Sequence, residues 1–174
     1  MSLCLLLGGA RSGKSSLAVQ LARRAGTRVT VVATAEARDD EMAARIEQHR
    51  AERPADWTTI EEPLALSATI QSVEAGDALI IDCLSLWAAN ALERELDVER
   101  DAAAAAATAA ARPGATIAVS NEVGLGVVPA TPLGRRYRDV LGRVNAIWAD
   151  AAEDVFFVAA GRVLRLARAE EALP

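Results

Sequence analysis

Short apolar runs recur along the chain and alternate with longer stretches of mixed apolar and polar residues. Four runs are rich in aliphatic residues and have the length of strands: Leu3–Leu7, Arg28–Ala33, Ala78–Asp82 and Thr116–Ser120. Apolar residues at helical spacing predict helices at Lys14–Ala25, Asp39–Arg53, Leu64–Val73, Ser85–Glu95, Val98–Ala111 and Arg135–Ala152. This alternation predicts a mostly parallel sheet that is covered by helices on both faces.

Near the end of the chain, the run Asp154–Ala159 is followed by Gly161 and a second short run, Val163–Leu166. A glycine between two such runs is typical of a hairpin. The predicted fold class is therefore α/β, a mostly parallel doubly wound sheet with a C-terminal hairpin. In such a sheet the carboxyl ends of the strands face the ligand crevice, so the residues just after each strand are the first candidates for function.

The first run is followed by GGARSGKS, which fits the phosphate-loop spacing GxxxxGK[ST] between a strand and a helix. Glycines let successive backbone N–H groups converge on phosphate oxygens, and the next helix directs its positive end at the same anion. Lys14 would contact the β and γ phosphates, and Ser15 would hold Mg²⁺. Nucleotide contacts are expected at Gly8, Gly9, Ala10, Arg11, Ser12, Gly13, Lys14 and Ser15.

Asp82 ends the third run and brings a carboxylate to the crevice beside this loop. P-loop enzymes hold magnesium through an aspartate in this context together with the loop hydroxyl. The alternative is that Asp82 caps the helix that starts near Ser85. The strand context favours the metal role.

The second run is followed by Thr34, Ala35 and Glu36, and then by Asp39, Asp40 and Glu41. Acidic residues in the first turn of a helix suit its macrodipole, so capping is the expected role of the second group. Thr34 is the better candidate for a contact with a nucleotide.

His49 is the only histidine in the chain, and its spacing places it on one helix face with Met42 and Ile46. A histidine at the end of an apolar stripe is more often packed than catalytic. It is nevertheless the best available nucleophile or general base in the sequence. The residues alone leave both roles open.

The fourth run ends in SNEVGLGVVP, which places Asn121 and Glu122 at the carboxyl end of a strand, before two closely spaced glycines. By spacing alone, a glycine turn and a functional loop fit this segment equally well. The tryptophans are expected in the core or at an interface rather than stacked on a ligand. They are Trp57, Trp87 and Trp148.

Composition limits the choice of partners and surroundings. The 174 residues, 52% of them hydrophobic and without a proline- or serine-rich linker, suit one domain over residues 1–174. A formal net charge of −5 opposes a broad nucleic-acid surface. Cys4 and Cys83 lie in apolar runs and are expected to be buried thiols, which suits a reducing cytoplasm. Neither a signal peptide nor an apolar run long enough to span a membrane is expected.

Five segments between Leu5 and Asn145 carry a family resemblance: GGARSGKS, ATAEARDDEMAARIEQHRAERPADWTTIEEP, LIIDCLSLW, SNEVGLGVVP and YRDVLGRVN. In this order they resemble the bifunctional adenosylcobinamide kinase/adenosylcobinamide-phosphate guanylyltransferase of cobalamin biosynthesis. Many proteins share the phosphate loop, but DDEMAARI followed by HRAERPADW, together with NEVGLGVVP, is much more specific. The chain departs from the family's usual pattern at Ala146 and in the tail RVLRLARAEEALP.

The resemblance implies an enzyme that phosphorylates adenosylcobinamide with a nucleoside triphosphate, ATP or GTP, and then transfers GMP from GTP through a guanylylated histidine. It implies catalytic roles for His49 and Lys14, and it agrees with Mg²⁺ at Ser15 and Asp82. Beyond the loop it implies nucleotide contacts at Thr34, Ala35, Glu36, Ala51, Glu52, Arg53, Pro54, Glu61 or Glu62, and Asp82. A RecA-like P-loop fold and a homotrimer are also implied, and we expect the subunit contact at Tyr137 and Trp148.

Two other functions are compatible with the residues. A monofunctional P-loop kinase for a small molecule would leave His49 without a covalent role. A nucleotide-regulated binding protein would use the γ-phosphate to order a switch segment, and its chemistry would be slow. The joint occurrence of the five segments favours the bifunctional enzyme.

Overall fold

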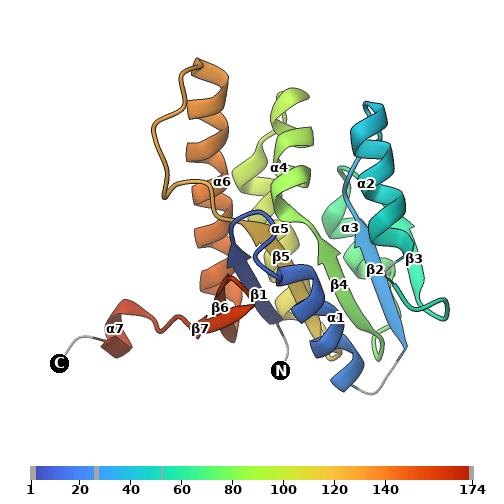
Figure 1. Ribbon diagram of the computed structural model, residues 1–174. Coiled ribbons are helices and arrows are strands. Elements are labelled where there is room, and N and C mark those ends of the chain that lie inside the picture. Colours follow the sequence, from blue (N-terminus) through green and yellow to red (C-terminus); the bar gives the residue numbers. More distant parts are fainter. Residues whose placement is uncertain (1–2, 26–27, 52, 173–174) are drawn as a thin grey trace.

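The structure is a computed structural model that describes residues 3–25, 28–51 and 53–172 (Figure 1). Within these residues, seven strands form one sheet in the order β3-β2-β4-β5-β1-β6-β7. The strands are β1 (Leu3–Gly8), β2 (Val29–Ala33), β3 (Thr58–Glu61), β4 (Ala78–Asp82), β5 (Thr116–Asn121), β6 (Asp154–Ala159) and β7 (Arg162–Arg165). All neighbouring pairs are parallel except β6 and β7, which form an antiparallel hairpin.

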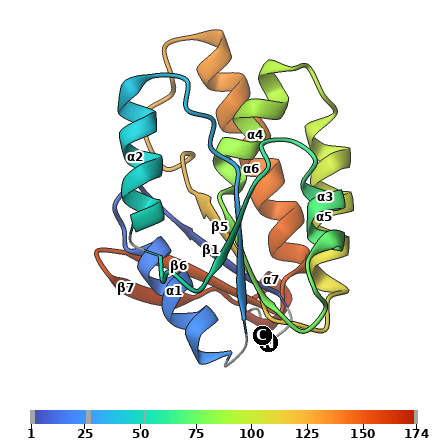
Figure 2. The same ribbon diagram turned by 90° about the vertical axis from the view of Figure 1, so that its right-hand side faces the viewer.

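The helices lie on both faces of this sheet, as the nearly edge-on view in Figure 2 shows, with α1 and α2 on one side and α3 to α6 on the other. They are α1 (Lys14–Arg24), α2 (Asp40–Ala51), α3 (Leu66–Ser72), α4 (Leu84–Glu93), α5 (Val98–Ala110), α6 (Pro132–Ala151) and the short α7 (Ala169–Ala172). The predicted α/β class, a mostly parallel doubly wound sheet with a C-terminal hairpin, is confirmed.

The core follows from the two-residue period of the buried strands. In β1, Leu3, Leu5 and Leu7 pack with α3, α4, α5 and α6, whereas Cys4 and Leu6 pack with α1. Strands β1, β2, β4 and β5 are buried almost throughout because helices cover both of their faces. The residues at the carboxyl ends of these strands are therefore positioned by a well-packed sheet.

Two elements and several boundaries differ from the sequence-based prediction. β3 was not predicted, because its residues are exposed or half-buried at the sheet edge and show no buried run. The short exposed helix α7 was also not predicted. Helix α6 begins at Pro132 rather than Arg135, since Thr131 caps it by accepting a hydrogen bond from the backbone N of Gly134.

The aromatic residues correct a further expectation. Trp148 is 0% exposed in the core, and the hydroxyl of half-buried Tyr137 donates to the backbone O of Ser85 at 3.1 Å. Both point inward because the apolar face of α6 packs on β1 and α4. The prediction that Trp148 makes a subunit contact is therefore wrong. Trp87 is also buried, as expected, and donates to the backbone O of Leu64.

Across residues 3–25, 28–51 and 53–172, none of the helices combines the length and apolar character that crossing a membrane requires.

Candidate functional site: a phosphate loop facing a histidine-bearing helix

The turn between β1 and α1 has the backbone of a phosphate loop. Gly13 precedes the helix with φ of 102°, a left-handed conformation that favours glycine. At Gly8, with φ of 153°, an added Cβ would lie 2.2 Å from the backbone O of Val158 in β6. The N–H of Gly161, in the hairpin, donates to the backbone O of Ser12 at 2.8 Å. The hairpin thus supports the loop from behind.

Lys14 is held over the loop. Its Nζ donates to the backbone O of Gly8 at 2.8 Å and of Gly9 at 2.7 Å, and only 7% of the residue is exposed. Burial lowers the pKa of this ammonium, and electrostatic interactions with Cys83 and Asp82 partly oppose that shift. The cation therefore lies where the loop amides would converge on phosphate oxygens.

A cavity of about 350 Å³ opens beside the loop, between α1, α2 and the carboxyl end of β4. Ser15, His49, Arg53, Trp57 and Asp82 are among the residues that line it. The structure therefore brings the predicted metal pair, Ser15 and Asp82, to one space with the predicted GMP acceptor. These residues come from separate elements and meet only through the fold.

Asp82 is the polar centre of this cavity. Its Oδ2 lies 3.3 Å from Arg53 Nη2 and 3.9 Å from His49 Nδ1. The second distance exceeds that of a hydrogen bond, but it lies within the range of electrostatic interaction. The Asp82 side chain is 20% exposed, so the carboxylate remains open to the cavity.

Helix α2, which carries His49, lies on the surface and buries none of its residues fully. Met42, Ile46 and His49 are half-buried on one face, so the predicted stripe exists but does not reach the core. Near the end of the helix, Arg50 forms an ion pair with Glu61 of β3. Helix α2 is therefore positioned mainly by polar contacts near its two ends.

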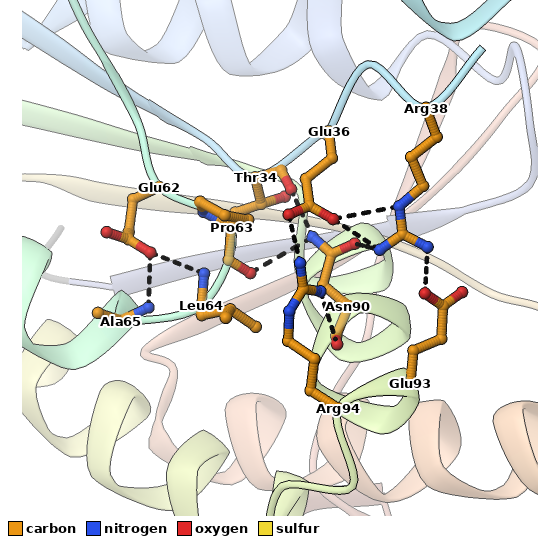
Figure 3. Close-up of polar contacts among 10 residues, drawn as sticks. All are labelled: Thr34, Glu36, Arg38, Glu62, Pro63, Leu64, Ala65, Asn90, Glu93 and Arg94. Atoms are coloured by element: carbon orange, nitrogen blue, oxygen red, sulfur yellow. Dashed lines mark hydrogen bonds and ion pairs between the residues drawn. The ribbon is translucent and has the colours of Figure 1, made fainter.

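The segment leading into α2 is fixed by the polar cluster drawn in Figure 3. Buried Asn90 donates to the backbone O of Thr34 at 2.8 Å and accepts from Arg38 at 2.8 Å. Glu36 accepts from Arg38 and Arg94, each at 2.6 Å, and these bonds, that of Arg38 first, lower the pKa of its carboxyl group. The cluster connects the start of α2 to α4.

Hydrogen bonds also fix two segments near this cluster, one at Thr34 and the other at Glu62. The hydroxyl of Thr34, 0% exposed, donates to the backbone O of Cys83 at 2.7 Å and accepts from its N–H at 2.9 Å. Glu62 caps the next turn by accepting from the backbone N of Leu64 and Ala65. Thr34, Ala35 and Glu36 are not among the residues that line the cavity. Their contact with a nucleotide stays a prediction.

Comparison with known proteins places this geometry in a family. The family model described as cobinamide kinase / cobinamide phosphate guanyltransferase matches residues 4–166. The bifunctional adenosylcobalamin biosynthesis protein CobP of Pseudomonas aeruginosa is 51% identical over 162 residues, which cover 90% of this chain and 92% of that protein. The protein CobU of Salmonella typhimurium is 38% identical over 175 residues, 90% of this chain and 95% of that protein.

The chain belongs to the cobinamide kinase/cobinamide phosphate guanyltransferase family. Among solved structures, a prototypical ATPase from the type III secretion system of pathogenic bacteria has a TM-score of 0.56 at 11% identity. The match covers 97% of this chain and 59% of that ATPase, and at this identity it shows the fold alone.

The remaining nucleotide contacts that the family resemblance implies lie at the end of α2 and between α2 and the end of β3. Ala51 ends the helix and is exposed, Pro54 accepts the backbone N–H of Trp57 at 3.1 Å, and Glu61 is paired with Arg50. Glu52 lies outside the described residues. Of the described positions in this group, Arg53 is the one that lines the cavity with Asp82.

Sequence reasoning missed two features of the site. Trp57 was expected in the core or at an interface, but it packs partly on the α1 side of the core and also lines the cavity. Its sequence context contains no signal for that second role. The pairing of Arg53 with Asp82 was also missed, because Arg53 follows the end of α2 and meets Asp82 only through the fold.

Proposed function

We propose that this chain phosphorylates the aminopropanol hydroxyl of adenosylcobinamide with ATP or GTP, and then transfers GMP from GTP to the new phosphate through a guanylylated His49. The observation that carries the proposal is that Ser15, Asp82 and His49 line one cavity beside Lys14. In phosphoryl transfer the acceptor attacks the γ-phosphorus of the nucleotide, whereas in guanylyl transfer the nucleophile attacks the α-phosphorus. A site that serves both needs a phosphate clamp and a separate nucleophile.

The phosphate clamp comes from the loop. Lys14 and the N-terminus of α1 would neutralise the β and γ phosphates, which orients the γ-phosphate for transfer. In the second step, the same clamp would hold the pyrophosphate that leaves when the α-phosphorus is attacked. Lys14 therefore serves both reactions.

The donor set suits Mg²⁺ bound together with a nucleotide. Ser15 and Asp82 supply hard oxygens, and among the described residues there is no cluster of three or more histidine, cysteine or acidic side chains that could hold a metal without help. Magnesium is commonly bound through one or two protein ligands plus substrate phosphates and waters. When bound here, it would offset charge on the transferring phosphate.

His49 supplies the nucleophile for guanylyl transfer. Its Nδ1 faces Asp82, which leaves Nε2 as the nitrogen directed away from that carboxylate. Nε2 attacks the α-phosphorus, and the bond to the pyrophosphate oxygen breaks. The phosphate of adenosylcobinamide phosphate then attacks the same phosphorus, and the imidazole leaves. Arg53 lines the same cavity as His49 and would offset charge on the α-phosphate.

Incubation with adenosylcobinamide and GTP, followed by mass spectrometry of the corrinoid, tests the proposal. The expected product is the GDP derivative. A corrinoid that gains a single phosphate and nothing more would instead identify a plain kinase, and an unchanged corrinoid would favour a nucleotide-regulated binding protein. We further propose a single domain that works as a homotrimer in the cytoplasm, and sedimentation at micromolar concentration tests the oligomeric state.

A further inference from the structure

The carboxyl end of β5 lies between two parts of the nucleotide site. β5 pairs with β1, which leads into the phosphate loop, and with β4, which ends at Asp82. Asn121 is fixed at this end, because its Nδ2 donates to Ser85 Oγ and its backbone O accepts from Asn145 Nδ2, both at 3.1 Å. The next residue, Glu122, is thereby held beside the loop.

Glu122 is a close neighbour of Lys14. The backbone N of Glu122 donates to the O of Gly8 at 3.1 Å, and Lys14 Nζ donates to the same oxygen at 2.8 Å. Because both groups bind one oxygen atom, Glu122 begins next to the cation that would contact the γ-phosphate. It reaches this position from β5, whereas His49 reaches the cavity from α2.

The carboxylate of Glu122 also differs from other acids at this edge of the sheet. Arginines pair with Glu36, Glu61 and Asp82. Glu122 forms no ion pair within residues 3–25, 28–51 and 53–172, and its Oε1 accepts a hydrogen bond from the backbone N of Gly124. A carboxylate whose charge no arginine offsets is suited to accept a proton from a substrate hydroxyl.

We propose that Glu122 is the general base of the kinase step, an assignment that rests on the proposed function. The acceptor hydroxyl oxygen attacks the γ-phosphorus, the bond from that phosphorus to the β,γ-bridging oxygen breaks, and the nucleoside diphosphate leaves with the electron pair. The hydroxyl proton passes to the Glu122 carboxylate and then to solvent. An aspartate has the corresponding role in protein kinases. His49 is left to serve guanylyl transfer alone.

The two half-reactions can be measured separately, which gives the test. Glu122→Gln keeps an oxygen that accepts from Gly124 N, so the turn is preserved, but the amide cannot take up a proton. Glu74→Gln is the matched control, because Glu74 is exposed and lies before β4, at the opposite end of the sheet. Phosphorylation of adenosylcobinamide is followed with γ-labelled nucleotide, and guanylylation of the protein with α-labelled GTP.

We expect Glu122→Gln to lower the rate of phosphorylation by about 10²-fold or more. Label from α-labelled GTP should remain at the wild-type level, and Glu74→Gln should match the wild type in both assays. Near-normal phosphorylation by Glu122→Gln overturns the assignment. Loss of both activities also overturns it, because Glu122 would then act on nucleotide binding or folding. If the wild-type protein does not phosphorylate adenosylcobinamide, the proposed function fails as well, so the two failures are distinguishable.

Discussion

His49 Nδ1 lies 3.9 Å from Asp82 Oδ2, although the two residues belong to α2 and β4 and are separated in the sequence by β3 and α3. Asp82 is also the predicted metal ligand, and it lies 3.3 Å from Arg53. The Asp82 carboxylate therefore lines the space assigned to Mg²⁺ and also lies near the histidine assigned to guanylyl transfer. This relationship predicts different outcomes for variants of the two residues.

Asp82→Asn should weaken both activities, because the amide keeps the size of the side chain but loses the charge that attracts the cation. The magnesium concentration needed for half-maximal rate should rise in both assays. Far-ultraviolet circular dichroism checks that the variant is folded. Unchanged magnesium dependence would show that Asp82 has a structural role only.

His49→Ala should abolish guanylylation and spare phosphorylation, because the variant removes the nucleophile but leaves Lys14, Ser15 and Asp82 in place. GTP labelled at the α-phosphorus should leave acid-labile, base-stable label on the wild-type protein and none on the variant. GTP labelled at the γ-phosphorus should leave no label on either. Persistent α-label on His49→Ala would place the acceptor on another residue.

Arg38→Ala should slow guanylylation more than phosphorylation. Arg38 bonds Glu36, Asn90 and Glu93 and so fixes the segment before α2, whereas the phosphate loop is supported by the hairpin. The exposed ion pairs contribute only about 0.2–1 kcal/mol each, and loss of the hydrogen bond to buried Asn90 adds about 1–3 kcal/mol to the fall in unfolding free energy. The two rates are measured with α- and γ-labelled GTP.

The matched control for Arg38→Ala is Arg28→Ala. It removes another exposed arginine, one that is paired with Asp77 at the opposite end of the sheet. An equal fall of both activities in Arg38→Ala, or the same selective fall in Arg28→Ala, would contradict the anchoring role of the Arg38 cluster.

Tyr137 should make the fold sensitive to alkali. Burial raises its pKa from 10.0 to about 12, so the folded state favours the neutral phenol. The stabilisation is complete below about pH 10 and is lost as the pH rises through about 12. In denaturant titrations, the free energy of unfolding should fall between about pH 10 and 12, and less steeply for Tyr137→Phe. If the free energy of unfolding fell equally steeply with pH in the wild type and in Tyr137→Phe, the result would contradict this account.

Much of the fold could be predicted from the sequence because its central strands are buried on both faces. Burial of both faces leaves uninterrupted aliphatic runs in β1, β2, β4 and β5. β3 could not be found in this way, since it is a short edge strand whose residues are exposed or half-buried. Trp148 of α6 was assigned wrongly to a subunit contact, because spacing gives the apolar face of a helix but not what covers that face.

The site was predictable to the extent that its chemistry is local. The phosphate loop is a continuous motif, and Asp82 follows a recognisable strand. The contact of Arg53 with Asp82 and the cluster of Glu36 with Arg38 and Arg94 join segments that only the folded sheet brings together. Such pairings depend on strand order, and spacing along the sequence does not reveal it.

The support of the phosphate loop by the hairpin has a consequence for how the protein is made. Ser12 of the loop accepts a hydrogen bond from Gly161, and Gly8 lies against Val158 of β6, although the loop precedes the hairpin by the elements from α1 to α6. Because translation proceeds from the N-terminus, these contacts can form only after β6 and the hairpin turn have been synthesised. The nascent chain therefore carries its phosphate-loop motif without the support of the hairpin while the segments from β2 to α6 are being made.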